Sequence, residues 1–313
     1  MITIPSEAAE IIKNGGVVAI PTETVYGLAA DAFNIQAVLK TFEAKGRPAD
    51  NPLIVHISNL EQLKKVAVNI PESAFLLANS FWPGPLTLVL QKHFNVPDIV
   101  TGGLPTVAVR MPDHSLALEV IQLAGPVTAP SANRSGTPSP TRAEHVQHDY
   151  QNSIPVLDGG ISRIGIESTV LDLTDEKPII LRPGAVIAEI IKEKTGISVF
   201  DLENSDSRNR TKSPGTRYTH YKPVATVEWL EPESKNIESK TYYIFHSDLD
   251  IQPAPNSFHY RGDFDSMARD LYDHFRTADH LSCTHIKIEP LPNLNKSQIL
   301  PALMDRISKA IGS

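Results

Sequence analysis

Strand-length apolar runs alternate with segments of helical period through the first 200 residues of this chain. The apolar runs are short and rich in β-branched side chains, which predicts buried strands. The segments between them repeat apolar residues every three to four positions, which predicts amphipathic helices. The expected strands cover residues 17–20, 53–57, 86–90, 107–111, 168–173 and 179–182, and the expected helices cover residues 6–14, 36–45, 59–67, 115–125 and 185–196.

This alternation is typical of an α/β fold built on one sheet with helices on its faces. The last two expected strands follow each other without a helix between them. A parallel pair needs a long crossover connection, so these two strands favour a mixed sheet rather than a purely parallel one.

The pattern changes after residue 203 and divides the chain into three parts. Residues 1–203 form the expected first domain, and residues 204–224 read as a linker because Ser, Asn, Pro and Gly replace aliphatic residues there. Strand and helix signals return in residues 225–313, which predicts a second and smaller α/β domain. The last helix is expected to be interrupted at Pro301.

Composition excludes several classes of protein. An apolar fraction of 41% with 21% charged residues suits a folded core, and the net charge of −7 disfavours a broad nucleic-acid surface. The single cysteine, Cys283, allows neither a disulfide framework nor a thiolate metal cage. The N-terminus lacks the features of a signal peptide, and no apolar run approaches the roughly 18 residues that span a bilayer. We therefore expect a cytoplasmic protein.

Four polar segments stand where strands are expected to end, which is where α/β sheets bind ligands. They are PTETVYGLAAD (21–31), KGRPADNPLIVH (45–56), PTVAVRMPDH (105–114) and PVTAPSANRSGTPSPT (126–141). Each has a simpler explanation, respectively a capped turn, a solvated helix end, an internal ion pair and a surface loop. Two further segments, GIESTVLD (165–172) and LRPG (181–184), add hydroxyls and another arginine.

Three side chains in these segments carry specific alternatives. Arg110 ends an apolar strand, so its charge requires an anion, supplied either by a protein carboxylate or by a substrate carboxylate. Lys45 and Arg47 suit phosphate oxygens, and the nearby prolines restrict the backbone that carries them. His56 is either a hydrogen-bonded core histidine or a ligand contact.

The combined set contains many hydroxyls and several cations but no pair of catalytic carboxylates. No HExxH, GxSxG, Walker or zinc-ligand spacing is present. Such a set suits the binding of a phosphate beside a carboxylate and does not indicate a protein nucleophile. Glu23 and Asp31 are the nearest candidates for a general base, although a water or a substrate group could serve.

Read in order, the motifs resemble a known family. PTETVYGL, KGRPxxNPLxVH, WPGPLTLVL, VAVRxP, APSANxSGxPSPT, GxxSTVxD and LRPG are similar to those of the YrdC-like threonylcarbamoyl-AMP synthases. The SPGxxxxHYxP segment and the small domain after it resemble the long, two-domain form of that family. One departure is Thr216, where this linker motif often has a methionine.

The resemblance implies the fold and the reaction. It implies an N-terminal YrdC-like twisted open mixed sheet with helices, followed by a smaller Rossmann-like α/β domain. The implied reaction joins L-threonine, bicarbonate or CO2, and ATP into threonylcarbamoyl-AMP and pyrophosphate, with Mg²⁺ arriving on ATP. The implied partner is a tRNA threonylcarbamoyl transfer complex, which modifies the adenosine next to the anticodon. No membrane and no strong direct binding of nucleic acid are expected.

The resemblance also implies roles for individual residues. Lys45 and Arg47 would be catalytic through the ATP phosphates, and no protein metal ligand is implied. The implied threonine-binding residues are Thr24, His56, Arg110, Ala129 and Ser168. The implied ATP-binding residues are Arg47, Asn51, Thr106, Ser131, Ser139, Arg182 and Tyr221.

Two further hypotheses concern the linker and other functions. The linker has five Lys or Arg residues and no acid between Ser207 and Val227, so it is either a solvated tether or a lid over the site. An RNA-binding or ribosome-associated module without adenylate synthesis is the alternative function. A carbamoyltransferase or hydrogenase-maturation activity is a second enzymatic alternative, disfavoured because the zinc-finger cysteines of such proteins are absent.

Overall fold

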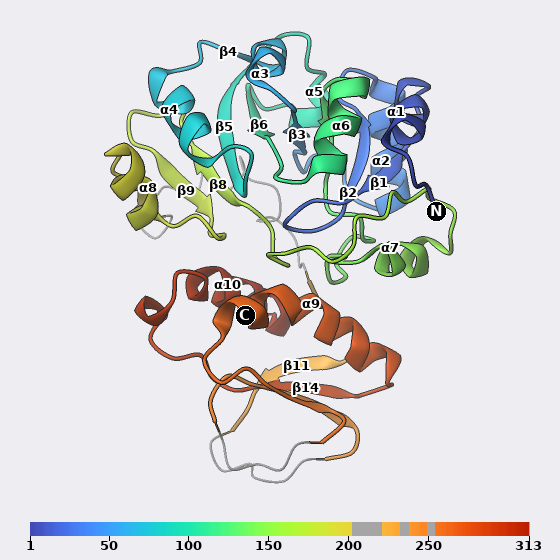
Figure 1. Cartoon of the computed structure of the whole chain (residues 1–313), viewed down its shortest axis with the longest axis vertical. Helices are drawn as coiled ribbons and strands as arrows, with labels where there is room; N and C mark the ends of the chain where they lie inside the picture. The colour runs from blue at the N-terminus through green and yellow to red at the C-terminus, as the bar shows by residue number, and fades with distance from the viewer. Residues whose placement is uncertain (202–220, 232–237, 249–253, 313) are drawn as a thin grey trace.

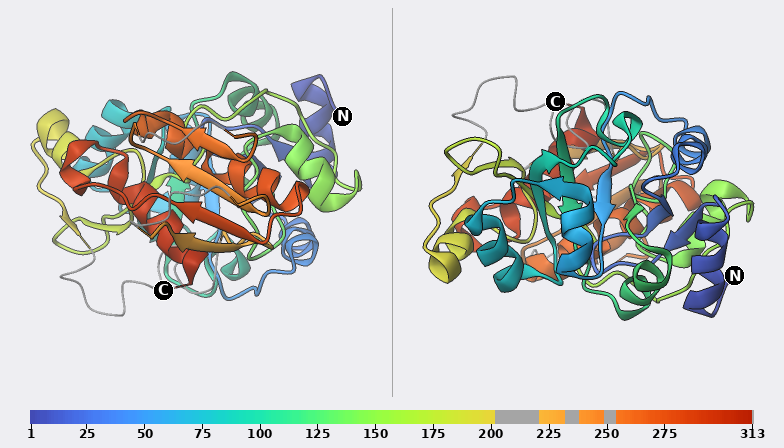
Figure 2. Two further views of the ribbon diagram at one scale, coloured as in Figure 1. Left: turned by 90° about the horizontal axis from the view of Figure 1, so that it is seen from below. Right: turned by 90° about the horizontal axis from the view of Figure 1, so that it is seen from above.

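The computed structural model of the protein describes residues 1–201, 221–231, 238–248 and 254–312. These residues form two α/β bodies, each built around its own sheet, that lie one above the other along the longest axis (Figure 1). Seen along that axis from below, the C-terminal body lies in front; seen from above, the larger N-terminal body lies in front (Figure 2). Most of the predicted linker, with Thr216 and four of its five cations, lies outside the described residues.

The larger sheet has ten strands in the order β1-β2-β7-β3-β6-β5-β8-β9-β10, and β4 pairs with β5 beside this path. Its strands are β1 (Val18–Ile20), β2 (Gly27–Asp31), β3 (Ile54–His56), β4 (Ala67–Val68), β5 (Leu86–Lys92), β6 (Thr106–Arg110), β7 (Val127–Thr128), β8 (Thr169–Asp172), β9 (Ile179–Arg182) and β10 (Phe200–Asp201). The pairs β3–β6, β5–β8 and β9–β10 are parallel, while β5–β6 and β8–β9 are antiparallel. The predicted mixed sheet is confirmed.

Helices cover this sheet, and most of them lie at places that the apolar periodicity predicts. They are α1 (Pro5–Lys13), α2 (Ile35–Lys45), α3 (Leu60–Val66), α4 (Glu72–Phe81), α5 (Asp98–Thr101), α6 (Ser115–Ala124), α7 (Ala143–Tyr150) and α8 (Ala188–Thr195). The Asn34 side chain caps α2 by accepting from two backbone N–H groups, and Gly46 ends that helix at a φ of 60°. These caps fix Lys45 in the last turn of α2 and direct the chain toward Arg47.

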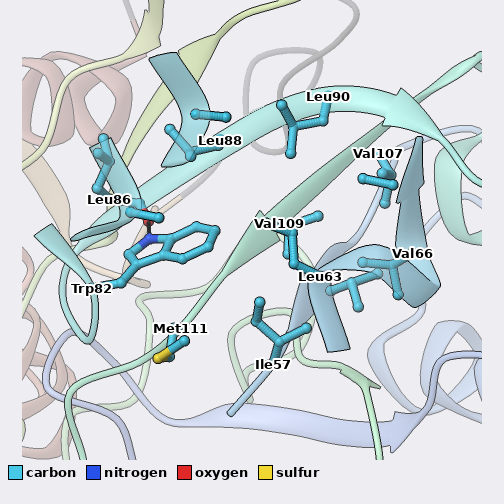
Figure 3. Close-up of a cluster of buried hydrophobic side chains, with 14 of the residues drawn as sticks. Ile57, Leu63, Val66, Trp82, Leu86, Leu88, Leu90, Val107, Val109 and Met111 are labelled. Atoms are coloured by element: carbon cyan, nitrogen blue, oxygen red, sulfur yellow. Dashed lines mark hydrogen bonds between the residues drawn. The ribbon is translucent and has the colours of Figure 1, made fainter. Parts of the chain in front are cut away.

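The main core lies on one face of β5 and β6. Alternation in a strand sends successive side chains to opposite faces, so Val107 and Val109 pack into this core with Leu88 (Figure 3). Ala108 and Arg110 therefore point to the other face of the sheet, toward the second body. The same alternation that builds the core places an arginine on the opposite side.

The second sheet is all parallel, in the order β11-β14-β12-β13. Its elements are β11 (Thr226–Trp229), β12 (Thr241–Phe245), β13 (Ser257–His259), α9 (Phe264–His280), β14 (His285–Ile288), the short 3₁₀ helix η3 (Leu294–Lys296) and α10 (Leu300–Ile311). Helices α9 and α10 lie between this sheet and the larger body (Figure 1). Val25 and Ile166 of the larger body join the apolar cluster built by Leu271, Phe275 and their neighbours.

Some elements differ from the sequence-based expectations. Strands β2 and β13 and helices α4 and α7 are not predicted by the sequence, because these segments are short or lack clear periodicity. Strand β2 (GLAAD) consists of small residues and is held by antiparallel pairing with β1 and β7. Pro301 does not interrupt the last helix. It lies in the first turn of α10, where a missing N–H costs no hydrogen bond. No helix within the described ranges is long and apolar enough to cross a membrane.

Candidate active site between the sheet and the C-terminal helices

A pocket that is partly open to solvent lies on the face of the larger sheet opposite the main core. Its walls come from strands β3 and β6, from the loops after β1 and β7, from the start of β8 and the end of β9, and from Tyr221. The lining residues are Thr22, Thr24, Val25, Gly27, Arg47, Pro52, Leu53, Ile54, His56, Arg110, Ala129, Pro130, Ser131, Asn133, Ser139, Glu167, Ser168, Arg182 and Tyr221. Segments that are far apart in sequence thus converge on one cavity.

Sheet pairing explains why His56 and Arg110 stand side by side. These residues are register partners in the parallel pair β3–β6, and each ends its strand. The loop after β7 reaches them because β7 pairs with β3 on the other side. Gly27 permits this approach, since a Cβ there would lie 3.0 Å from the Cβ of Ala129.

Arg110 is buried and held by three groups of the protein. Its Nη2 lies 2.7 Å from the Glu23 carboxylate, its Nη1 donates to Thr24 Oγ1 at 2.9 Å, and its Nε donates to the Gly84 carbonyl at 3.2 Å. Of the two anions that the sequence left open, a protein carboxylate is therefore present. The guanidinium still lines the pocket, so it remains accessible to a small ligand.

His56 is a neutral imidazole at ordinary pH. Burial, together with the nearby charge of Arg110, lowers its pKa from 6.5 to about 3. Its Nδ1 lies 3.3 Å from the Ile54 carbonyl oxygen, which can only accept. A proton on Nδ1 leaves Nε2 as an acceptor, so His56 can receive a hydrogen bond from an amine or a hydroxyl in the pocket.

Arg182 and Ser168 form a second polar group in the same pocket. Arg182 donates through Nε to the Ser168 carbonyl and through Nη2 to Ser168 Oγ, both at 3.1 Å. Ser168 Oγ also lies 2.8 Å from Thr87 Oγ1. Burial lowers the pKa of Arg182, yet an arginine stays charged in this range. The pocket therefore has a fixed cation at the end of β9.

The two cations at the end of α2, Lys45 and Arg47, lie in different environments. Arg47 lines the pocket and donates through Nη2 to the Pro52 carbonyl at 2.8 Å. Lys45 does not line the pocket; its Nζ donates to the carbonyls of Ser131 and, at 2.7 Å, Asn133. Burial, with the charge of Arg47 nearby, lowers the pKa of Lys45 well below its usual range. Lys45 thus holds the loop after β7 in place.

The remaining predicted residues lie in and near this pocket. Thr24, Ala129, Ser131, Ser139 and Tyr221 line it. Asn51 is buried next to the lining residue Pro52, and neither polar atom of its side chain has a hydrogen-bond partner within the described ranges.

Thr106 does not line the pocket. It begins strand β6, four residues before Arg110, on the same face of the sheet. At about 3.3 Å of rise per residue, it lies roughly 13 Å from Arg110 along the strand. Its predicted contact would therefore need a ligand that extends along the sheet.

Glu167 is the main residue that the sequence analysis missed. Its carboxylate lines the pocket and accepts from Ser139 Oγ at 2.6 Å, Tyr272 Oη at 3.0 Å and Arg306 Nε at 2.8 Å. Burial opposes ionisation, but the charges of Arg306 and Arg182 hold the pKa of Glu167 at about 2. The residue stands in the segment GIESTVLD, yet its partners in the second body lie more than 100 residues away in sequence, and no local signal indicates them.

A second cavity lies between the two bodies, on the other side of α9. It is lined by residues that include Arg142, Arg163 and Arg269. Each of these arginines is paired with a protein carboxylate, at distances of 2.6–2.9 Å. The described residues contain no cluster of three or more His, Cys, Asp or Glu side chains that could hold a metal ion. The pocket on the larger sheet is therefore the stronger candidate for the chemistry.

Buried arginines, a neutral histidine and hydroxyls on one face of an α/β sheet define a site that suits a small anionic molecule. Comparison with known proteins gives the family. The family model described as "Telomere recombination" matches residues 10–184, and the model described as "Threonylcarbamoyl-AMP synthase, C-terminal domain" matches residues 185–312.

Relatives match over nearly the whole chain. A protein of Pyrococcus abyssi named "Threonylcarbamoyl-AMP synthase" is 44% identical over 97% of this chain and 93% of its own. A Bacillus subtilis protein of the same name is 42% identical over 98% and 92%. A solved structure described as "Crystal structure of P. abyssi Sua5 complexed with L-threonine" covers 100% of this chain and 98% of its own, with 42% identity and a TM-score of 0.88.

The chain belongs to the threonylcarbamoyl-AMP synthase family, in its two-domain form. Members of this family are enzymes, so an RNA-binding module without adenylate synthesis is not favoured.

Proposed function

We propose that this chain synthesises threonylcarbamoyl-AMP and pyrophosphate from L-threonine, bicarbonate or CO2, and ATP in the pocket on its larger sheet. The observation that carries the proposal is the convergence of Arg47, Arg110 and Arg182 on one cavity. Three fixed cations suit a carboxylate at one end and a phosphate chain at the other. The names of the relatives supply the same reaction product.

The end of the pocket near β3 and β6 suits L-threonine. Arg110 would meet the carboxylate of the amino acid, sharing its guanidinium with Glu23. Neutral His56 would accept a hydrogen bond from the amine or the hydroxyl of the substrate. Thr24, the Ala129 backbone and Ser168 would complete this end.

The opposite end suits the nucleotide. Arg47 and Arg182 would face phosphate oxygens, and Tyr221 would cover the nucleotide from the second body. The buried amide of Asn51 supports this assignment, because an unpaired buried polar group costs about 1–3 kcal/mol that a polar ligand can offset. Ser131 and Ser139 would add hydroxyl contacts, and Thr106 would be reached only by the far part of the nucleotide.

The reaction itself needs no protein nucleophile. The amine of L-threonine captures CO2 as a carbamate, a carbamate oxygen attacks the α-phosphorus of ATP, and pyrophosphate leaves. Negative charge grows on the leaving oxygens, so preorganised cations there lower the barrier, by about 3–4 kcal/mol for one donor. Holding three substrates in line contributes roughly 7–11 kcal/mol more.

Lys45 acts in this scheme through the loop that it holds. Its two bonds to backbone carbonyls fix Ser131 and Asn133 at the nucleotide end of the pocket. A direct contact between Lys45 and a phosphate, as the family resemblance implies, would require the ammonium group to exchange one of these carbonyls for a phosphate oxygen.

Magnesium would enter as part of MgATP. The carboxylate in the pocket, Glu167, already accepts from three donors, so the protein offers no open ligand set for a resident ion within the described ranges. We further place the reaction in the cytoplasm, with the product passed to a tRNA threonylcarbamoyl transfer complex. A strong direct contact with nucleic acid is not part of the proposal, because the net charge of the chain is −7.

The test is pyrophosphate release by the full-length protein. Release should require L-threonine and bicarbonate together with ATP and Mg²⁺, and threonylcarbamoyl-AMP should be detected by mass spectrometry. Pyrophosphate release that is independent of threonine would contradict the proposal. RNA binding with a steep salt dependence and no response to ATP would favour the alternative function instead.

A further inference from the structure

Glu167 joins the two bodies of the protein at the wall of the pocket. Ser139, its partner in the larger body, donates to Oε1. Tyr272 of α9 and Arg306 of α10 donate to Oε2 from the C-terminal body. The carboxylate therefore links a predicted nucleotide contact to two helices of the other body.

Arg306 also contacts residues other than Glu167. Its side chain is 0% exposed, and its Nη2 donates to the Pro183 carbonyl at 3.1 Å, directly after Arg182. Its guanidinium carbon lies 5.5 Å from the ring centroid of Tyr221, and the Tyr221 ring also stacks on Tyr272 at 5.3 Å between centroids. A single arginine thus contacts one predicted nucleotide residue, Tyr221, and the immediate neighbour of a second, Arg182.

The charges around Glu167 affect where the side chain of Arg182 can lie. Two cations, Arg182 and Arg306, act on the single carboxylate of Glu167. Because Arg306 pairs with Glu167 directly, Arg182 can keep its bonds to Ser168 while it lines the pocket. Without Arg306, Arg182 would be the nearest charge left to neutralise a buried carboxylate, and it would be drawn away from the nucleotide.

We propose that Arg306 is a positioning residue for the nucleotide end of the active site. By neutralising Glu167 and packing on Tyr221, it leaves Arg182 and Tyr221 in place to meet ATP. The inference rests on the proposed function, because it assigns ATP to this end. It also gives the C-terminal body a role, namely completion of the nucleotide half of the pocket.

At the threonine end, Arg110 and His56 do not depend on Arg306, and Ser168 is linked to it only through Arg182. The hydrogen bonds and the ion pair of Arg110 involve Glu23, Thr24 and Gly84, and His56 is bonded within its own strand. All of these residues belong to the larger body. Loss of Arg306 should therefore affect ATP and L-threonine unequally, whereas a purely structural role would alter both substrates together or only the thermal stability.

The experiment compares steady-state pyrophosphate release by full-length wild type, R306M and R306K. We expect R306M to raise KM for ATP by roughly 10- to 100-fold, the range that a small misplacement of binding groups produces. KM for L-threonine should stay within about twofold, and R306K should restore part of the ATP affinity because it keeps the charge. The matched control is R142M, which removes another ion pair between the bodies, to Asp273, without touching this pocket.

A double variant separates charge from packing, and Y272F keeps the inference testable if R306M does not fold. The E167Q and R306M changes together remove both charges of this pair and leave Asp305 to Lys309, so Arg182 is no longer drawn toward Glu167. The double variant should bind ATP more tightly than R306M alone. Y272F, which removes one donor to Glu167 without changing charge, should raise KM for ATP less than R306M does.

The outcomes distinguish the inference from the proposed function. Absence of threonine-dependent pyrophosphate release in wild type would remove the proposed function. An active wild type with an unchanged KM for ATP in R306M would overturn the inference alone. Equal increases in both KM values would assign Arg306 a structural role and would also overturn it.

Discussion

The Nη2 atom of Arg110 lies 2.7 Å from the Glu23 carboxylate, and both side chains are buried. Arg110 therefore already has a protein anion as its partner, in a site that is proposed to bind a second anion, the carboxylate of L-threonine. A buried pair of this kind does little for stability in itself, but loss of one partner is costly because the other charge stays in the interior. The pair can be tested by removing each charge in turn.

Glu23→Gln should destabilise the protein in the absence of substrate by about 3–5 kcal/mol, because Arg110 loses its partner. L-threonine should offset part of that loss by supplying a carboxylate. The rise in Tm on adding L-threonine should therefore be larger in this variant than in wild type, and Arg110→Met should show no rise. Equal shifts in wild type and Glu23→Gln would contradict a threonine carboxylate at Arg110.

Arg47→Ala should reduce pyrophosphate release by roughly 10²- to 10³-fold while the fold persists, because it removes one preorganised donor. Lys45→Ala should also reduce turnover but should lower the free energy of unfolding as well, since it leaves the Ser131 and Asn133 carbonyls without their donor. Arg163→Ala is the exposed control. Wild-type turnover in both variants would exclude these roles.

Stability should fall at acid pH because of His56. Its pKa is about 3 in the folded protein against 6.5 ordinarily, so the unfolded chain takes up the proton first. Its contribution is complete above pH 6.5 and is lost as pH falls toward 3, by up to about 1.4 kcal/mol per pH unit. His145 and His274 have lowered pKa values too, so the measurement is the difference between wild type and His56→Gln.

In urea unfolding between about pH 6 and 4, the free energy of unfolding of wild type should decline more steeply than that of His56→Gln. Above about pH 7 the two curves should run parallel. Equal slopes across the acid range would show that the imidazole is not buried in its neutral form.

Gly165→Ala should loosen the contact between the two bodies. A Cβ at Gly165 would lie 2.1 Å from the Arg269 carbonyl oxygen of α9, and the φ of Gly165 is +77°. Gly160 has almost the same φ, +78°, but a Cβ there would have no atom within 4 Å. Gly160→Ala therefore reports the backbone strain alone, and Gly165→Ala should cost about 1–3 kcal/mol more in urea unfolding. Equal costs would mean that α9 moves freely away.

Deletion of residues 204–313 should leave poor catalysis or a leaking intermediate, because it removes Tyr221 and Arg306 and exposes Val25 and Ile166. Pyrophosphate release and the yield of threonylcarbamoyl-AMP would be measured together. Unchanged values would remove both the lid hypothesis for the linker and any catalytic role for the C-terminal body.

Local sequence determined most elements of the larger sheet and the polar composition of the site. The runs at residues 53–57 and 107–111 have the apolar character of strands, and His56 and Arg110 stand out because they are polar residues near the ends of those runs. The motif resemblance then placed most of the polar residues that line the pocket. These features are visible in sequence because each depends on neighbours only a few positions away.

Tertiary structure alone decided the partners of those residues. Glu23 as the anion of Arg110, Lys45 as the anchor of the loop after β7, and Arg306 as the partner of Glu167 all depend on contacts between distant segments. Burial is what makes these contacts matter, because charges in a low-dielectric interior must be paired. A sequence displays charges, whereas only the folded chain determines which of them are withdrawn from water together.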